Sequence, residues 1–99
     1  MNISLPGSFT ILGTNYKVKL VKKIDNEGSL GICDPDKRLI KIRKDLLLED
    51  MEATFLHELT HAILFTLGYN ELSEDERFVE QISQAIYQVI KTSKWQLKN

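Results

Sequence analysis

Hydrophobic and polar positions alternate with a period of two in the first half of the chain. Tyr16, Val18 and Leu20 are separated by Lys17 and Lys19. This spacing is typical of a strand that buries one face and exposes the other. The segment therefore predicts a half-buried strand.

Two further apolar stretches, at 30–33 and 38–43, flank the sequence DPDK. Because Asp and Pro favour tight turns, these two stretches predict a hairpin. Together with the strand around Tyr16, the hairpin predicts an antiparallel sheet of about three strands within residues 8–43, with a further short piece at 9–12.

From about residue 50 the apolar positions recur at intervals of three and four, which indicates a helix. They are Met51, Phe55, Leu59, Ala62, Ile63 and Leu67. Gly68 comes next and supplies a stop, because glycine tolerates the left-handed conformation that closes a helix. We expect this helix over about 50–67.

A second helix is expected over about 73–91. Ser73 and Glu76 have the spacing of a capping box, in which each side chain binds a free backbone N–H at the start of the helix. The expected apolar face contains Phe78, Ile82, Ala85, Ile86 and Val89. The sequence thus predicts one α+β domain over 1–99, a small antiparallel sheet followed by two packed helices.

Composition excludes several classes of function. The chain has 13 Lys and Arg against 14 Asp and Glu, so it offers no basic field for nucleic acid. Its single cysteine permits no internal disulfide. It shows neither a basic leader with a long apolar core nor a stretch long enough to span a membrane. We expect a soluble cytoplasmic protein without nucleic-acid or membrane partners, and its oligomeric state stays open.

Both histidines of the chain lie in the sequence HELTH, at His57 and His61. On a helix these positions share one face about a turn apart, so both imidazoles can bind one Zn²⁺ ion. Glu58, next to His57, can reach a water on that ion without binding the ion itself. Such zinc lowers the pKa of its water toward about 7, and a carboxylate can take the proton as the water attacks a carbonyl.

The alternative is a chance match in a helix whose histidines merely pack. At average composition the pattern arises by chance in roughly a few of every thousand chains of this length. His57 and His61 also interrupt an apolar stretch, where two unpartnered imidazoles would be costly to bury. Metal binding is therefore the favoured interpretation.

A catalytic zinc normally has three protein ligands, and no third histidine exists. A carboxylate is required, and the near candidates are Glu71, Glu74, Asp75, Glu76 and Glu80. Glu76 has a structural role as the capping partner of Ser73, whereas Glu80 has none. The residues alone favour Glu80 and leave Glu76 as the alternative.

The segments 57–61 and 80–84 together resemble those of the gluzincins, the thermolysin-like zinc metallopeptidases. The second segment also looks like the corresponding one of ImmA/IrrE-type peptidases, which act on repressors of phages and mobile elements. The short chain is similar to the minimal members, the minigluzincins, and to small phage and prophage proteins. The resemblance implies Glu80 as third zinc ligand and Ser83 as a small residue one turn on, while Gln84 departs from the expected Asp or Asn.

The resemblance also implies that the strand before the first helix, 38–42, binds substrate backbone by strand addition; an ordinary edge strand is the alternative. Amide hydrolysis further needs a group that stabilises the transition state. Tyr87, two turns beyond Glu80, is a candidate donor, although a packing role for this tyrosine is favoured. Cys33 is expected to be a small buried hydrophobe rather than a ligand.

The sequence thus predicts zinc-dependent hydrolysis of a peptide bond in a peptide or protein, with a phage or mobile-element regulator as one candidate substrate. The main alternative is a catalytically weak or inactive zinc-binding domain with a regulatory or interaction role, since a chain of 99 residues leaves little wall for a substrate cleft. A third, a DNA-binding or phage-assembly protein with a fortuitous motif, predicts no zinc at all.

Overall fold

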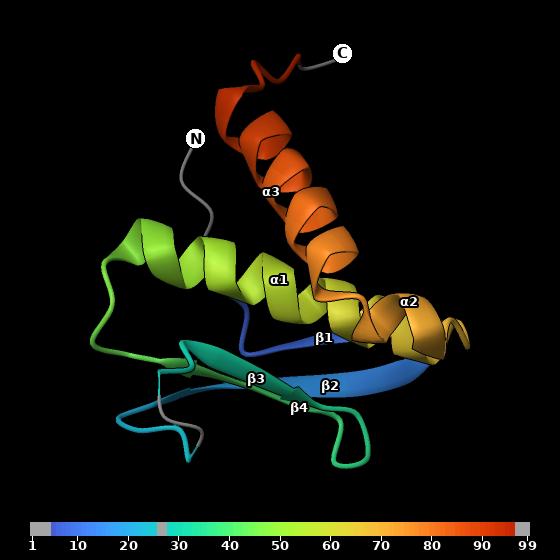
Figure 1. The fold of residues 1–99 in the computed structure, drawn as a ribbon. Helices are drawn as coiled ribbons and strands as arrows, with labels where there is room; N and C mark the ends of the chain where they lie inside the picture. The colour runs from blue at the N-terminus through green and yellow to red at the C-terminus, as the bar shows by residue number, and fades with distance from the viewer. Residues whose placement is uncertain (1–4, 26–27, 97–99) are drawn as a thin grey trace.

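A computed structural model describes residues 5–25 and 28–96. Four strands precede three helices (Figure 1). The strands are β1 (Ser8–Ile11), β2 (Thr14–Val21), β3 (Gly31–Asp34) and β4 (Leu39–Arg43), and the helices are α1 (Leu48–Thr66), α2 (Asn70–Glu74) and α3 (Glu76–Thr92). The predicted α+β class is confirmed.

The sheet is mixed rather than antiparallel, with the strand order β1-β2-β4-β3. β1 pairs with β2, and β3 with β4, in antiparallel fashion, which confirms the predicted hairpin and the short first piece. β2 and β4 are parallel, with Lys17 opposite Leu39 and Val21 opposite Arg43. The prediction of a purely antiparallel sheet was therefore wrong.

Burial explains why β4 takes the inner position. Ile40 and Ile42 are both 0% exposed, so the strand that carries them is best placed between two neighbours. β3 lies at the far edge of the sheet, and β4 returns from there between β3 and β2. β4 is thus a central strand, and the expectation that 38–42 binds substrate as a free edge was wrong.

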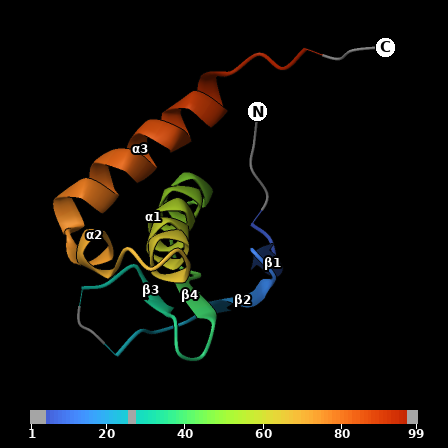
Figure 2. The same ribbon diagram turned by 90° about the vertical axis from the view of Figure 1, so that its right-hand side faces the viewer.

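Helix α1 lies over one face of the sheet. Its residues Phe55, Leu56 and Ala62 form the buried core together with Tyr16, Ile40 and Ile42 from the strands. In Figure 2, α1 is seen nearly along its axis, with the sheet below it and α3 running diagonally above it. α1 is therefore packed between the sheet and α3.

The predicted end of α1 is confirmed. The last residue of α1 is Thr66 and its C-cap is Leu67. Gly68 follows with a left-handed φ of 85°. The amide of Gly68 donates to the carbonyl of Phe65, 3.0 Å away, which satisfies one of the free carbonyls at the helix end. No helix in the described part of the chain combines the length and apolar character that crossing a bilayer requires.

The second predicted helix is in fact two helices, because α3 begins three residues later than expected. The N-cap of α3 is Asp75, whose side chain accepts a hydrogen bond from the backbone amide of Phe78 at 3.1 Å. Ser73 instead lies within the short helix α2. The predicted capping box of Ser73 and Glu76 was therefore wrong, and Glu76 is free for another role.

The buried face of α3 also differs from the predicted one. Val79 and Ser83 are the buried residues of this helix, whereas Ile82, Ile86 and Val89 are 39%, 44% and 61% exposed. Both buried residues lie outside the predicted apolar face, so the prediction of the buried side of α3 was wrong. α3 crosses α1 and rises away from the rest of the molecule (Figure 1), which leaves much of its apolar surface uncovered.

Gly31 lets strand β3 approach α1 closely. A Cβ atom at this position would lie 2.6 Å from Cγ2 of Thr54 and 3.3 Å from Cγ of Glu58. The first distance is shorter than any normal contact, so even a methyl group must push the strand and the helix apart. A glycine here keeps β3 against the helix face that carries HELTH.

Replacing Gly31 with Ala is expected to lower the free energy of unfolding by about 1–3 kcal/mol because of this overpacking. Chemical denaturation measures the change. Thr54→Ser, which removes the closest methyl group, should recover part of the loss in the double variant. Gly7→Ala is the control, since a Cβ atom there meets nothing within 4 Å. Equal effects of the two Gly→Ala variants would contradict the close-packing argument.

Candidate metal centre

The two histidines lie on the face of α1 that meets α3 and the edge of the sheet. Their side chains are 19% and 16% exposed for His57 and His61, respectively. The ring centroids are 5.1 Å apart, and the rings are inclined by 64°. The spacing of four residues therefore brings the two imidazoles together, as predicted, and leaves them partly accessible to solvent.

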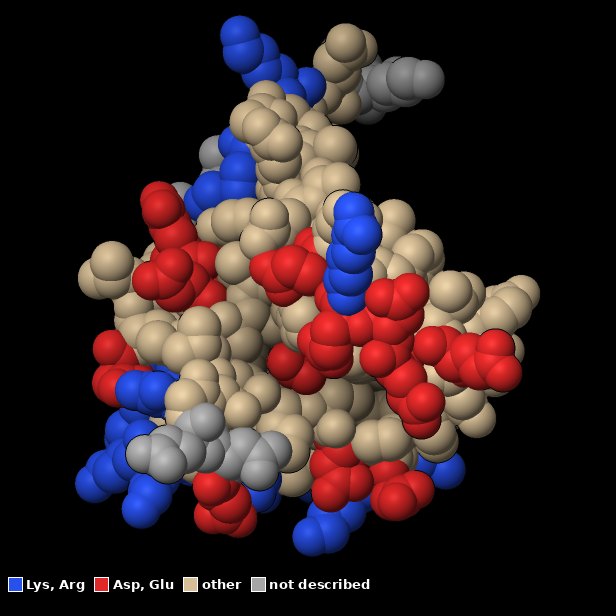
Figure 3. Space-filling model, in the orientation of Figure 1, with Lys and Arg blue, Asp and Glu red and all other residues tan. Residues whose placement is uncertain are grey.

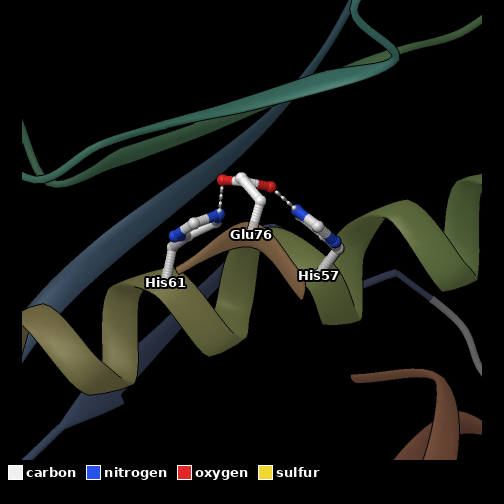
Figure 4. Close-up of side chains that lie close together, drawn as sticks. All are labelled: His57, His61 and Glu76. Carbon is white, nitrogen blue, oxygen red and sulfur yellow. Dashed lines mark hydrogen bonds and ion pairs between the residues drawn. The ribbon is translucent and has the colours of Figure 1, made fainter. Parts of the chain in front are cut away.

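Glu76, the first residue of α3, lies across both histidines (Figure 4). Its Oε2 is 3.1 Å from Nε2 of His57, and its Oε1 is 2.9 Å from Nε2 of His61. Among the described residues, His57, His61 and Glu76 form the one group of potential ligands whose atoms all lie within 4.8 Å of one another. The sequence had ranked Glu76 second as a ligand.

The donor set fits a zinc ion. Two imidazole nitrogens and one carboxylate form a ligand set found in catalytic zinc sites, where a water occupies the fourth position. Ligand atoms about 2.0–2.1 Å from a tetrahedral ion are roughly 3.3 Å from one another. The two contacts of Glu76, one from each of its carboxylate oxygens, measure 3.1 and 2.9 Å and are close to this spacing.

Glu80 lies one turn further along α3, on the opposite side of the His57 ring. Its Oε2 is 2.7 Å from Nδ1 of His57, and its Oε1 accepts a hydrogen bond from the side-chain amide of Gln84. A carboxylate on the outer nitrogen of a histidine orients the ring and leaves the other nitrogen for a metal. This geometry favours Glu76 as the third ligand and Glu80 as the residue that orients His57.

The assignment of Glu80 as ligand therefore stays a sequence prediction, whereas the distances in the structure group Glu76 with both histidines. Sequence reasoning ranked Glu76 lower because a capping box accounted for it. Asp75 was the signal that could have corrected this ranking, since Asp is as good an N-cap as Ser and moves the start of the helix.

Glu58 lies beside the histidines but faces the sheet. Its side chain is almost completely buried, with 8% of the residue exposed. Burial raises its pKa from 4.5 to about 7, with a further increase from the charges of Glu76 and Glu80, while His57 and a hydrogen bond to the backbone of Cys33 lower it. A carboxyl group with a pKa near neutrality can both accept and return a proton at physiological pH.

A cavity of about 290 Å³ opens beside His57 and Glu58. Three parts of the chain line it: the start of β3 with the residue before it, α1, and α3. The lining residues are Leu30 and Gly31, then Asp50, Ala53, Thr54, His57 and Glu58, and finally Glu80, Ser83 and Gln84. Figure 3 shows acidic side chains gathered over α2 and the start of α3, beside a recess in the same face. No Lys, Arg or Tyr is among the described residues that line the cavity.

The structure does not bring Tyr87 to the histidines. Its hydroxyl donates to Oε1 of the buried Glu52 at 3.0 Å and lies 3.3 Å from the backbone carbonyl of Glu49. Burial and the Glu52 carboxylate raise the pKa of Tyr87 to about 12. These contacts fasten α3 to the first half of α1, which is the packing role that the sequence favoured.

Cys33 lies on β3 and packs partly against the core. Burial raises the pKa of its thiol to about 12, and the nearby charges of Glu58 and Asp34 act in the same direction. The thiolate is the form that binds metals, so this cysteine is a poor ligand at neutral pH. Its position agrees with a small buried hydrophobe.

Comparisons with protein-family models, with curated proteins and with solved structures gave no match for this chain.

Proposed function

We propose that this protein is a minimal zinc metallopeptidase of gluzincin type, which hydrolyses a peptide bond in a peptide or protein. The observation that carries the proposal is the position of Glu76 across the Nε2 atoms of His57 and His61, at 3.1 and 2.9 Å. A buried carboxyl group, Glu58, lies beside this group and lines a cavity that opens to solvent. Ligands, base and access for a substrate thus occur together.

His57, His61 and Glu76 would hold the ion in this proposal. When bound, zinc supplies a positive charge that polarises a carbonyl and lowers the pKa of a water to about 7. Glu58 accepts the proton of the attacking water at its carboxylate and returns it to the nitrogen of the leaving amine. The buried setting that raises the pKa of Glu58 to about 7 suits both transfers.

The free edge of β3 is the place for a substrate chain. β3 has β4 on one side and no partner strand on the other among the described residues. Gly31 at its start lines the cavity, together with His57 and Glu58. An extended segment of the substrate can add to this edge through backbone hydrogen bonds, which would lay a peptide bond along the histidines.

A zinc-binding regulatory or interaction domain with little or no hydrolysis is the second candidate. Two observations favour it. The lining of the cavity contains no Lys, Arg or Tyr among the described residues, and the hydroxyl of Tyr87, the candidate donor, is hydrogen-bonded to Glu52 instead. Peptide hydrolysis gains much of its rate from groups that stabilise the developing negative charge.

For either function we propose a cytoplasmic location, since a lone cysteine agrees with a reducing compartment.

Zinc content per chain, measured by elemental mass spectrometry on untagged protein, tests the proposal. We expect one zinc in the wild type. Glu76→Ala should purify without zinc because a ligand is lost, whereas Glu80→Ala should weaken zinc binding about 10- to 100-fold because only the orientation of His57 is lost. Glu74→Ala, an exposed acidic residue nearby, should match the wild type.

An exchange of the two results, with zinc lost only in Glu80→Ala, would restore the ligand set predicted from the sequence. A wild type that stays free of zinc after reconstitution would overturn the proposal.

Hydrolysis is then assayed on an unfolded protein such as casein, with and without a chelator. Activity that disappears with the chelator and returns with zinc supports the peptidase; a zinc-loaded protein that never cleaves supports the regulatory domain.

A further inference from the structure

Ser73 contacts the second histidine from the short helix α2. Its Oγ is 3.2 Å from Nδ1 of His61 and 3.5 Å from the backbone carbonyl oxygen of the same residue. The other nitrogen of this ring, Nε2, faces Glu76 at 2.9 Å. His61 is therefore held between one residue of α2 and the first residue of α3.

The chemistry of a hydroxyl group permits both contacts at once. A serine hydroxyl has one proton to donate and lone pairs that accept. The hydroxyl of Ser73 can donate to the backbone carbonyl of His61 and accept a proton from Nδ1 at the same time. When a metal is bound at Nε2, the proton of the neutral ring is on Nδ1, where Oγ of Ser73 can accept it.

This protonation pattern is the one that metal binding requires. A neutral histidine binds a metal through the nitrogen that has no proton, and the partner of the other nitrogen selects which one that is. His57 has Glu80 on its Nδ1 at 2.7 Å, and Ser73 occupies the equivalent place on His61. Both Nε2 atoms are thereby directed toward Glu76.

We propose that Ser73 is a positioning residue of the metal centre, which fixes the protonation and orientation of His61 and holds the segment before α3 against α1. This inference rests on the proposed zinc site. None of the α2 residues is fully buried, so the contacts of Ser73 with His61 add to the packing that holds α2 against α1. Ser73 precedes the ligand Glu76 by three residues, and its two contacts with His61 therefore also help to set the position of Glu76.

The test compares substitutions that keep or remove the hydroxyl group. Ser73→Thr keeps the hydroxyl group. Ser73→Val has nearly the shape of the threonine variant but lacks the hydroxyl group, and Ser73→Ala removes the hydroxyl group without adding bulk. Ser8→Ala, at an exposed position of β1, is the control. Zinc affinity is measured by chelator competition on the folded protein, the absorption spectrum of the Co²⁺-substituted protein reports ligand geometry, and denaturation reports the stability of the metal-free form.

We expect Ser73→Val and Ser73→Ala to bind zinc about 10-fold or more weakly and to alter the Co²⁺ spectrum. Ser73→Thr should stay within about threefold of the wild type because its hydroxyl can make the same contacts. The Thr and Val variants differ only in that hydroxyl, so the ratio of their affinities measures its effect even if both are less stable than the wild type.

A purely structural serine gives a different result. The Val and Ala variants would then lose stability without metal but keep the wild-type zinc affinity and Co²⁺ spectrum, and this outcome would overturn the inference. Failure of the proposed function is distinct, since the wild type itself would then bind no zinc and give no Co²⁺ spectrum.

Discussion

Glu58→Gln is expected to abolish peptide hydrolysis while zinc stays bound. Glu58 lies next to His57 in the chain, but its carboxyl group is outside the group of potential ligands formed by His57, His61 and Glu76. Glutamine has the same shape but accepts no proton, so the attacking water loses its base and the leaving amine its acid. Proton transfer by a positioned side chain typically contributes 10²- to 10⁴-fold in rate.

The rate of chelator-sensitive hydrolysis and the zinc content are measured on the same preparation. Glu71→Gln, an exposed substitution on α2, is the control and should keep both. Glu58→Asp keeps the carboxyl group but withdraws it by one methylene, so we expect partial activity. Full activity in Glu58→Gln would exclude Glu58 as the base. A biological function that survives this substitution would favour the regulatory zinc-binding domain.

The same substitution is expected to stabilise the metal-free protein at neutral and higher pH. The pKa of Glu58 is raised from 4.5 to about 7 by burial in the folded protein. Between these two values the unfolded chain releases its proton while the folded chain keeps it, so stability falls as the pH rises. Above about pH 7 the whole cost of burying the charge is present, on the order of 3 kcal/mol for a shift of this size.

Glutamine at position 58 carries no charge, and the variant therefore lacks this cost. We expect the difference in unfolding free energy between Glu58→Gln and the wild type to grow from near zero at about pH 4 to its full value at about pH 8. Denaturant titrations in the presence of a chelator measure it, and the comparison of the two proteins cancels the titration of other groups. A difference that is independent of pH would show that Glu58 is not buried as a titrating group.

Under the proposed function, the two expectations describe a residue that serves the chemistry at a cost in stability. A buried carboxyl group next to the histidines weakens the metal-free fold above neutral pH, and in the proposed reaction it would act as a base whose pKa lies near neutrality. Within a chain of 99 residues such a cost is substantial, since small domains have only a few kcal/mol of net stability.

Local patterns predicted the elements of the fold well. Alternation around Tyr16 located β2, the DPDK turn located the hairpin of β3 and β4, and Gly68 marked the end of α1. Each of these features depends on residues that are neighbours in the chain, so their sequence spacing carries the information. The position of His57 and His61 on one face of a helix follows from the same kind of local geometry.

Features that depend on distant segments were not predicted correctly. The parallel pairing of β2 with β4 arises because the fully buried Ile40 and Ile42 take an inner place in the sheet, which no local pattern specifies. Ile82 and Ile86 on α3 are likewise exposed, because the buried side of this helix is the one that carries Val79 and Ser83. Periodicity shows that a face is apolar, but only the assembled fold decides whether another element covers it.

The sequence by itself determined the chemistry of the candidate site, namely two histidines one turn apart with a glutamate beside the first. Helical periodicity is sufficient for that conclusion because all three residues lie on one element. Only the tertiary structure decided which carboxylate meets the two Nε2 atoms. The N-cap at Asp75 sets where α3 begins, and the packing of α3 across α1 brings Glu76 between the histidines and Glu80 to the outer side of His57. Such a contact between residues far apart in the chain is decided by packing, which sequence spacing does not encode.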